Sequence, residues 1–269
     1  MTVYQTKIEN LSVAVYPDRA RMGAAAAQRA GEVIRRAMEA RGEANVIFAA
    51  APSQNEMLDA LAVQDIDWGK VRAFQQDEYI GLPSGHPAGF GSYLEEHIFR
   101  RLPFKEVCYM GVPAPERAGE RCAQYAALLE RYPPDLILLG FGENGHLAFN
   151  DPPVADLGDP ERVKVVELEE RCRLQQVHDG CFARLADVPT HAMTLTLSAI
   201  MAAPAAVITV PGARKADAVR AALAGPVETA CPASILRQHP NARLYLNRDS
   251  AAKAFAGGKL GWQRIKIGR

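Results

Sequence analysis

Residues 135–152 read DLILLGFGENGHLAFNDP, an apolar run that ends in glycine and continues into a cluster of polar side chains. Four consecutive apolar residues before Gly140 predict a short strand covered on both faces, as in the parallel sheets of α/β proteins. The glycines at Gly140 and Gly142 would let a ligand approach the backbone closely. Ligands of such sheets bind beyond the carboxyl ends of the strands, so we expect the chemistry to follow this strand.

The rest of the chain repeats this alternation of short apolar strands and helical stretches. The longest helix is predicted from about Asp18 to Arg41, with Asp18 as its N-cap and Gly42 just past its end. The alternation predicts one α/β domain over residues 1–269, with a mainly parallel, twisted, Rossmann-like sheet and helices on both faces. Residues 250–269 carry basic side chains and no acid, and they are expected to form a basic C-terminal tail. Strands are predicted at 11–16, 45–50, 71–75, 136–140, 162–167, 193–197, 206–210 and 243–246, and further helices near 54–63, 89–101, 117–131 and 213–224.

Composition excludes several classes of protein. The chain has 269 residues, of which 48% are apolar and 23% charged, and 31 basic residues balance 31 acidic ones. This composition therefore excludes an intrinsically disordered chain and a protein that binds nucleic acid through a large positive charge. No run approaches the ~20 apolar residues of a membrane span, and the N-terminus lacks a signal-peptide pattern, so we expect no membrane contact and a cytoplasmic address. Five cysteines without a C-x-x-C pair favour reduced thiols, and without a metal-ligand cluster we expect no metal or cofactor.

The polar cluster after residue 140 is the strongest candidate for chemistry. Glu143, Asn144, His146, Asn150 and Asp151 fall within nine residues of one another. Histidine is the side chain whose ordinary pKa suits proton transfer near neutrality. A polar turn with a hydrogen-bonded histidine is the alternative reading of the same residues.

Two other predicted strands also end in polar residues. Asp77 and Glu78 are adjacent carboxylates, and their repulsion would leave one with a raised pKa suited to a base; an ordinary acidic loop is the alternative. Ser53 and Gln54 stand where a strand passes into a helix, and free N–H groups at a helix start attract anions. For that segment, a helix start capped by Ser53 is the plainer alternative.

These segments together resemble the glucosamine-6-phosphate deaminase/isomerase family, which shares its fold with 6-phosphogluconolactonases. The order and spacing of the matching motifs hold from about residue 45 to residue 246. The run LAFNDP after His146 looks like the deaminase branch, whereas lactonases typically continue with a sequence of the Ser-Leu-Phe-Pro type. The motifs are DEYIGLP at 77–83 with His86-Pro87 and Ser92-Tyr93, the G-x-G-x-x-G-H-x-A-F-N-x-P pattern at 140–152, PTHAMTLT at 189–196 and PGARK at 211–215.

The resemblance implies a reaction and a role for each matching residue. Glucosamine 6-phosphate, or a related hexosamine 6-phosphate, and water would give a ketose phosphate and ammonia. Asp77 would carry a proton from C2 to C1, His146 would help to open the sugar ring, and Asp151 would support His146 where the family has a glutamate. Lys215 matches a lysine that contacts the substrate phosphate. The predicted catalytic residues are Asp77, Asn144, His146 and Asp151, and the predicted substrate- or phosphate-binding residues are Ala51, Ser53, Gln54, Gly142, Arg173 and Lys215.

The chain departs from the family pattern in three places. Asn144 stands where an aspartate usually precedes Gly-His, and an amide cannot act as a base. Residues 50–53, AAPS, replace a glycine- and threonine-rich phosphate loop, and Pro52 removes one N–H donor. Arg173 matches the family's phosphate-binding arginine only loosely. These departures leave open the sugar epimer and the presence of an amine on the substrate. The alternatives are a 6-phosphogluconolactonase-type hydrolase and a non-catalytic sugar-phosphate-sensing domain, and the family resemblance also predicts a homo-oligomer.

Overall fold

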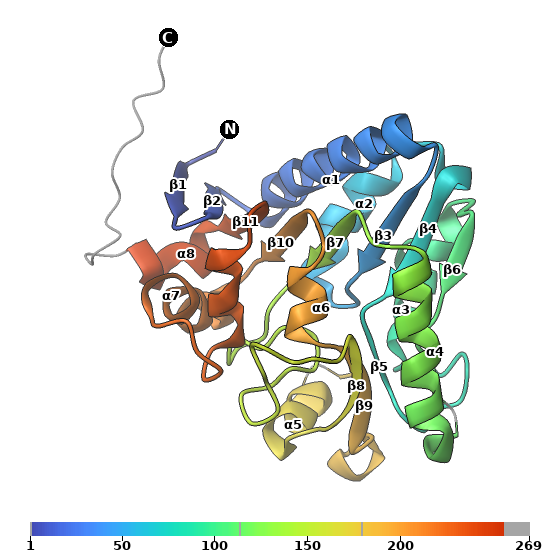
Figure 1. Ribbon diagram of the computed structural model, residues 1–269. Helices are drawn as coiled ribbons and strands as arrows, with labels where there is room; N and C mark the ends of the chain where they lie inside the picture. Colours follow the sequence, from blue (N-terminus) through green and yellow to red (C-terminus); the bar gives the residue numbers. More distant parts are fainter. Residues whose placement is uncertain (1, 113, 179, 256–269) are drawn as a thin grey trace.

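The computed structural model describes residues 2–112, 114–178 and 180–255, and strands alternate with helices along most of this length (Figure 1). The strands are β1 (Tyr4–Ile8), β2 (Leu11–Tyr16), β3 (Ala44–Phe48), β4 (Val71–Gln75), β5 (Asp77–Tyr79), β6 (Glu106–Cys108), β7 (Leu136–Leu139), β8 (Val163–Glu167), β9 (His191–Leu195), β10 (Ala206–Val210) and β11 (Ala242–Asn247). The α-helices are α1 (Arg19–Arg41), α2 (Asn55–Ala62), α3 (Phe90–His97), α4 (Ala118–Arg131), α5 (Glu170–His178), α6 (Leu197–Met201), α7 (Ala216–Ala224) and α8 (Arg248–Phe255). Short 3-10 turns include η1 (Pro52–Gln54), η5 (Leu185–Asp187), η6 (Ala213–Lys215) and η7 (Pro232–Gln238).

Eight strands form the central sheet, in the order β1-β2-β11-β10-β7-β3-β4-β6. β1 runs antiparallel to β2, and the other neighbouring pairs run parallel. This confirms the predicted α/β class with a mainly parallel sheet. From β3 the chain proceeds through β4 to β6 on one side, then returns to place β7 on the other side of β3. The strand order reverses there, which is where open parallel sheets bind their ligands.

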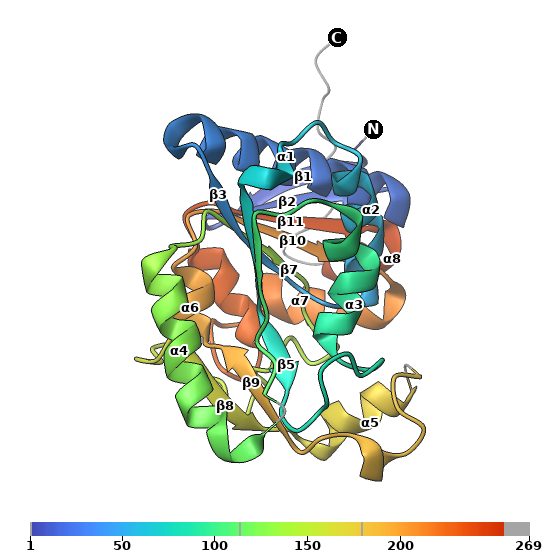
Figure 2. The same ribbon diagram turned by 90° about the vertical axis from the view of Figure 1, so that its right-hand side faces the viewer.

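Helices cover both faces of this sheet, because its central strands are buried on both sides (Figure 2). In β7, Leu136 and Leu138 pack into the core beneath α1, α2 and α3, whereas Ile137 and Leu139 pack into the core beneath α4, α6, α7 and α8. This alternation follows from the two-residue period of a strand. The result is a three-layer arrangement with one hydrophobic core on each face of the sheet.

The predicted caps of α1 are confirmed. The side chain of Asp18 accepts a hydrogen bond from the Arg21 backbone N–H, and Gly42 adopts the left-handed conformation (φ 81°) while its N–H bonds to the Met38 carbonyl. Small residues such as Ala26 and Ala30 are fully buried against the sheet, and Gly23 lies where a Cβ would fall 2.6 Å from the backbone of Glu56 in α2. α1 and α2 therefore pack closely at the end of the sheet that carries the loop after β3.

The structure corrects the prediction for two strands. β8 and β9 do not join the parallel sheet; they form a separate antiparallel sheet in the order β5-β9-β8. Val165 in β8 is 40% exposed while its neighbour Val166 is buried, so this small sheet has one solvated face. A strand's own sequence sets its inward and outward positions, but partners distant in the chain set its place in a sheet.

The end of the chain also differs from the prediction. Residues 250–255 belong to helix α8 rather than to a tail, because Ala251, Ala254 and Phe255 are buried and Lys253 pairs with Asp217 at 2.6 Å. The remainder of the predicted tail, residues 256–269, lies outside the described residues. Within the described ranges, no helix is both long and apolar enough to cross a membrane.

Candidate active site

The loop after β7 is folded around its glycines. The imidazole of His146 lies against Gly142, where a Cβ would fall 2.2 Å from the ring atom Cε1. The Gly142 N–H donates to the His146 carbonyl at 3.0 Å, and Gly145 turns the chain with φ 84°. A Cβ on Gly145 would also fall 2.6 Å from the sulfur of Cys231, so the loop is enclosed on that side. The glycines that the sequence placed here therefore fix the position of the histidine.

His146, Asp151 and Asn144 form one connected group. The ring atom Nδ1 of His146 lies 3.0 Å from Oδ1 of Asp151, and the Asn144 amide Nδ2 donates to the same oxygen at 2.8 Å. The Asn144 Oδ1 in turn accepts the His146 backbone N–H at 3.1 Å. Asp151 has 2% of its side chain exposed and His146 20%, so the carboxylate is sealed while the imidazole can reach a ligand.

Asp151 has a lowered pKa. Burial disfavours its charged form, but hydrogen bonds from His146, Asn144 and Cys172 together with the charge of His146 outweigh that effect. An ionised carboxylate beside Nδ1 holds the imidazole in one orientation and leaves Nε2 available for proton transfer.

Asp77 has the properties expected of a general base. It begins β5, directly after the carboxyl end of β4, and it is buried. Burial raises its pKa well above the ordinary aspartate value, and the charge of Glu78 adds to this, while a hydrogen bond from Gln76 opposes it. A carboxylate whose pKa lies closer to neutrality accepts a proton more strongly once ionised.

Two residues connect Asp77 with the loop of His146. Thr194 in β9 is the register partner of Asp77, and its hydroxyl accepts the Phe149 backbone N–H at 3.1 Å. Burial raises the pKa of the Cys172 thiol in α5, and the charges of Asp151 and Asp77 add to this. The structure thus brings all four predicted catalytic residues, Asp77 and the connected group of Asn144, His146 and Asp151, to the same side of the small sheet.

The loop after β3 borders the same region. Nε2 of Gln54 donates to the Ser53 hydroxyl at 3.0 Å and to the Leu139 carbonyl at 3.2 Å. Gly140 lies so close to both side chains that a Cβ there would approach each to 2.9 Å. Thr209, at the end of β10, donates its hydroxyl to the Ser53 carbonyl at 3.2 Å. Ser53 and Gln54 are therefore held between the ends of β7 and β10, and Ala51 opens the turn as the residue before η1.

The loop after β10 also meets the histidine loop. Lys215 ends η6, immediately before α7, and its neighbour Arg214 has its Nε 3.7 Å from a carboxylate oxygen of Glu143. This contact joins the segment that carries Lys215 to the segment that carries His146. The carboxyl ends of β3, β7 and β10 thus supply the predicted phosphate-binding residues Ser53, Gln54, Gly142 and Lys215.

Arg173 is not brought into this group by the contacts that the structure shows. Its Nη2 donates to the carbonyls of Leu185 and Val188, both at 2.9 Å, and so fixes the turn η5 to helix α5. The loose match of Arg173 to the family's phosphate-binding arginine has no counterpart in the contacts of its Nη2.

Two residues that the sequence analysis did not assign support the site. Glu78 accepts four hydrogen bonds behind Asp77, and Arg19 donates to both carboxylate oxygens of Glu56, at 2.6 and 2.9 Å, and to the Pro52 carbonyl at 2.7 Å. Arg19 thereby clamps the loop that carries Ser53. The partners of Arg19 lie more than thirty positions away, so no local pattern marks it, whereas Glu78 was noted only as the acidic neighbour of Asp77.

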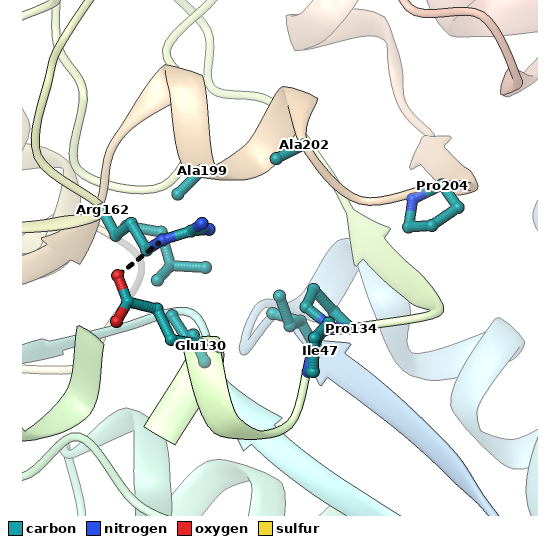
Figure 3. A pocket seen from close by; sticks show the side chains of 10 residues that line it. Ile47, Glu130, Pro134, Arg162, Ala199, Ala202 and Pro204 are labelled. Carbon is teal, nitrogen blue, oxygen red and sulfur yellow. Dashed lines mark ion pairs between the residues drawn. The ribbon is translucent and has the colours of Figure 1, made fainter. Parts of the chain in front are cut away.

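A cavity of about 310 Å³ lies apart from these residues (Figure 3). It opens where the chain enters β7 and β10, at the amino ends of the strands, and the ion pair between Arg162 and Glu130 (3.5 Å) spans part of it. None of the predicted site residues lines it. In the described part of the chain, no group of three or more histidine, cysteine or carboxylate side chains is arranged to hold a metal ion.

The sequence of this chain is similar to those of known proteins over most of its length. Residues 17–246 match the family model of glucosamine-6-phosphate isomerases and 6-phosphogluconolactonases. A glucosamine-6-phosphate deaminase of Listeria monocytogenes is 33% identical over 229 residues, covering 85% of this chain and 95% of the relative. One from Exiguobacterium sibiricum is 36% identical over 189 residues, covering 70% of this chain and 72% of the relative.

Solved structures share the fold. A structure described as a monomeric glucosamine-6-phosphate deaminase superposes with a TM-score of 0.82 at 23% identity, covering 90% of this chain and 99% of its own. A 6-phosphogluconolactonase from Trypanosoma brucei superposes with a TM-score of 0.74 at 18% identity, covering 93% and 99%. At these identities the likeness concerns the fold alone.

Proposed function

The chain belongs to the family of glucosamine-6-phosphate isomerases and 6-phosphogluconolactonases, and on this basis we propose that it is an amino-sugar-phosphate deaminase/isomerase. Its substrate is glucosamine 6-phosphate or a closely related hexosamine 6-phosphate, and its products are the matching ketose 6-phosphate and ammonia. The names of the relatives that match over most of the chain support this assignment.

One observation carries the proposal: the buried carboxylate of Asp77, whose pKa is raised, has as its register partner Thr194, whose hydroxyl holds the segment of Asp151 and His146. Isomerisation between an aldose and a ketose needs a base that moves a proton between adjacent carbons, together with a separate acid–base group for the ring oxygen. The two carboxylates have opposite pKa shifts, raised for Asp77 and lowered for Asp151, which suits two different tasks.

The residues divide the steps of the reaction as follows. His146, oriented by Asp151, transfers the proton that accompanies ring opening and yields the open-chain aldehyde. Asp77 then removes the proton from C2, giving an enolamine, and returns it to C1, giving a ketimine. Water adds to the ketimine carbon at C2, and the C–N bond breaks to release ammonia and leave the ketose. No redox change occurs, so these residues need no electron carrier.

The loops after β3 and β10 are proposed to hold the phosphate. The cationic Lys215 stands at the start of α7, where N–H groups not bonded within the helix favour an anion. The hydroxyl of Ser53 and the backbone of Gly142 belong to the neighbouring loops after β3 and β7. Because Pro52 has no backbone N–H, this turn offers the phosphate one hydrogen-bond donor fewer, and Lys215 contributes a larger share of the phosphate binding.

Asn144 gives the site one carboxylate fewer than a relative with aspartate at that position. Its amide acts as a neutral bridge, since Nδ2 donates to Asp151 and Oδ1 accepts from the His146 backbone. A second carboxylate could not donate to Asp151 unless it were protonated. We propose that the amide keeps Asp151 ionised and correctly placed, at the cost of a second acid–base group.

The test is a substrate panel with purified protein. Glucosamine 6-phosphate and galactosamine 6-phosphate are supplied separately, and ammonia and ketose phosphate are measured in the same sample. Asp77→Asn should abolish both products, whereas Asp65→Asn, which changes an exposed aspartate beyond the end of α2, should change neither. Equal amounts of ammonia and ketose from one epimer support the proposal and identify the substrate.

Other outcomes separate the alternatives. Hydrolysis of 6-phosphogluconolactone without ammonia release would assign the chain to the lactonase branch, and tight binding of sugar phosphates without turnover would indicate a sensing domain. Ketose formation from non-amino sugars alone would indicate an isomerase with a different substrate. The predicted homo-oligomer and cytoplasmic location are tested separately, by light scattering of the purified protein and by cell fractionation.

A further inference from the structure

Glu78 is a buried carboxylate that the proposed reaction does not use. It is the middle residue of β5 and the immediate neighbour of Asp77, and both are buried. Adjacent side chains of a strand point to opposite faces, so Asp77 and Tyr79 share one face and Glu78 lies on the other. The ring of Tyr79 contacts Phe149 at 5.3 Å between centroids, which directs that face towards the histidine loop. Glu78 therefore lies behind the proposed base.

Four N–H groups surround the Glu78 carboxylate. Oε2 accepts from the Gln75 side chain at 2.9 Å and from the Gly91 backbone at 2.7 Å. Oε1 accepts from the backbones of Tyr79 and Phe90, at 2.9 and 3.0 Å. Two of these donors are the first N–H groups of α3, whose own N-cap residue is a glycine and supplies no side-chain cap. Donors of this kind stabilise the charged form of a carboxylate.

Glu78 is also the charged neighbour that Asp77 experiences. Besides Glu78, the described titratable groups that interact with Asp77 include Tyr79, Tyr125 and Cys172. Burial raises the pKa of both phenols and of the thiol, so these three groups stay neutral at physiological pH. A fixed negative charge on the next residue, partly shielded from water, disfavours ionisation of Asp77.

We propose that Glu78 is a positioning residue for Asp77: its hydrogen bonds tie α3 to the strand that carries Asp77, and its carboxylate lies directly beside the proposed base. This inference rests on the proposed function for the role of Asp77. The Gln75 side chain completes the arrangement, since its Oε1 accepts the Met110 backbone N–H at 2.9 Å while its Nε2 holds Glu78. Glu78 itself touches no substrate in this scheme.

Two substitutions divide these effects. Glu78→Gln removes the charge and one acceptor oxygen, because its amide Nε2 cannot accept a hydrogen bond. Glu78→Asp keeps the charge while withdrawing the carboxylate from α3 by one methylene. In kcat/KM against pH, the acid limb of Glu78→Gln should move to lower pH by about one unit, because one repelling charge is lost. Its plateau should fall, because a less basic carboxylate is a weaker base. The kcat/KM of Glu78→Asp should fall, while the acid limb of its pH profile stays within a few tenths of a pH unit of that of the unchanged protein.

A matched control and a second measurement complete the test. Glu96→Gln removes an exposed carboxylate from the same helix α3, and its profile should equal that of the unchanged protein. Carboxyl ¹³C NMR follows Asp77 without substrate, and its protonation should move to lower pH in Glu78→Gln but not in Glu78→Asp. These spectra decide the inference even if the protein shows no deaminase activity.

The proposal is overturned if folded Glu78→Gln leaves the acid limb and the Asp77 resonance unmoved, or if Glu78→Asp moves them as far as Glu78→Gln does. A purely structural role for Glu78 would give that last result.

Discussion

Replacing Gly142 by alanine should misplace the proposed catalytic histidine without straining the backbone. Gly142 is not among the glycines with positive φ, so alanine fits its backbone conformation. The added Cβ would lie 2.2 Å from Cε1 of His146 and 2.5 Å from both ring nitrogens, whereas ordinary contact begins near 3.4 Å. The ring must therefore move by about 1.2 Å, and Asp151 at 3.0 Å from Nδ1 would lose its contact with it.

The size of the effect follows from that displacement. A catalytic group misplaced by about 1 Å costs on the order of 100-fold in rate. Forcing a methyl group into a filled space costs roughly 1–3 kcal/mol of stability, which a folded domain of this size can tolerate. We therefore expect kcat for deamination to fall about 100-fold while the protein remains folded, as measured by ammonia release and urea unfolding.

The control for Gly142→Ala is Gly119→Ala. Gly119 lies exposed in the first turn of α4, where an added Cβ meets nothing within 4 Å, so this variant should keep full activity and gain a few tenths of a kcal/mol or more. If Gly142→Ala retained more than a third of the activity, the reasoning that Gly142 fixes the imidazole would be refuted.

Three further changes probe the rest of the site. Because the pKa of Asp151 is lowered in the folded chain, its ionised carboxylate adds to the free energy of unfolding above the ordinary pKa of 3.8, and this contribution is lost as the pH falls below that value. In urea unfolding between pH 3 and 7, Asp151→Asn should lack this loss of stability at acid pH. Lys215→Ala should raise KM about 10- to 100-fold with a smaller change in kcat, while Lys70→Ala, on the surface, should change neither. Arg173→Ala leaves two backbone carbonyls without their partner and should cost roughly 1–3 kcal/mol of stability. An increase in KM as large as that of Lys215→Ala would instead restore the phosphate-binding prediction for Arg173.

The sequence predicted the central sheet well where local signals were strong. Strands β2, β4 and β10 have the predicted bounds, and the caps of α1 lie at the predicted residues. Long apolar runs can only be buried on both faces, and Asp18 and Gly42 have clear capping chemistry. The order of the strands within the sheet was not predicted, because it depends on pairing between distant segments.

The strands β1, β5 and β6 and the small second sheet were not predicted, since they are short or depend on partners far along the chain. β5 has only three residues and pairs with β9, more than one hundred residues later. Glu78 was recognised only as the acidic neighbour of Asp77, because nothing local to DEY shows that its carboxylate would meet the start of α3. Likewise, the sequence could not show that Nη2 of Arg173 bonds to the backbone carbonyls around η5, and its phosphate-binding role stays a prediction.

The pairing of β2 with β11 has a consequence for how the protein is made. Ser12 and Arg243 are register partners although they are 231 positions apart in the chain. At a ribosomal rate of about 5–20 residues per second, β2 waits roughly 10–50 seconds for its neighbour to emerge. During that time its open edge is exposed to pairing with other nascent chains. The rings of Tyr4 in β1 and Phe255 in α8 lie 5.0 Å apart between centroids, so the first and last described elements meet in the finished fold. A circular permutant that joins them and starts at an exposed loop would synthesise β11 and β2 in succession, and it should aggregate less during expression.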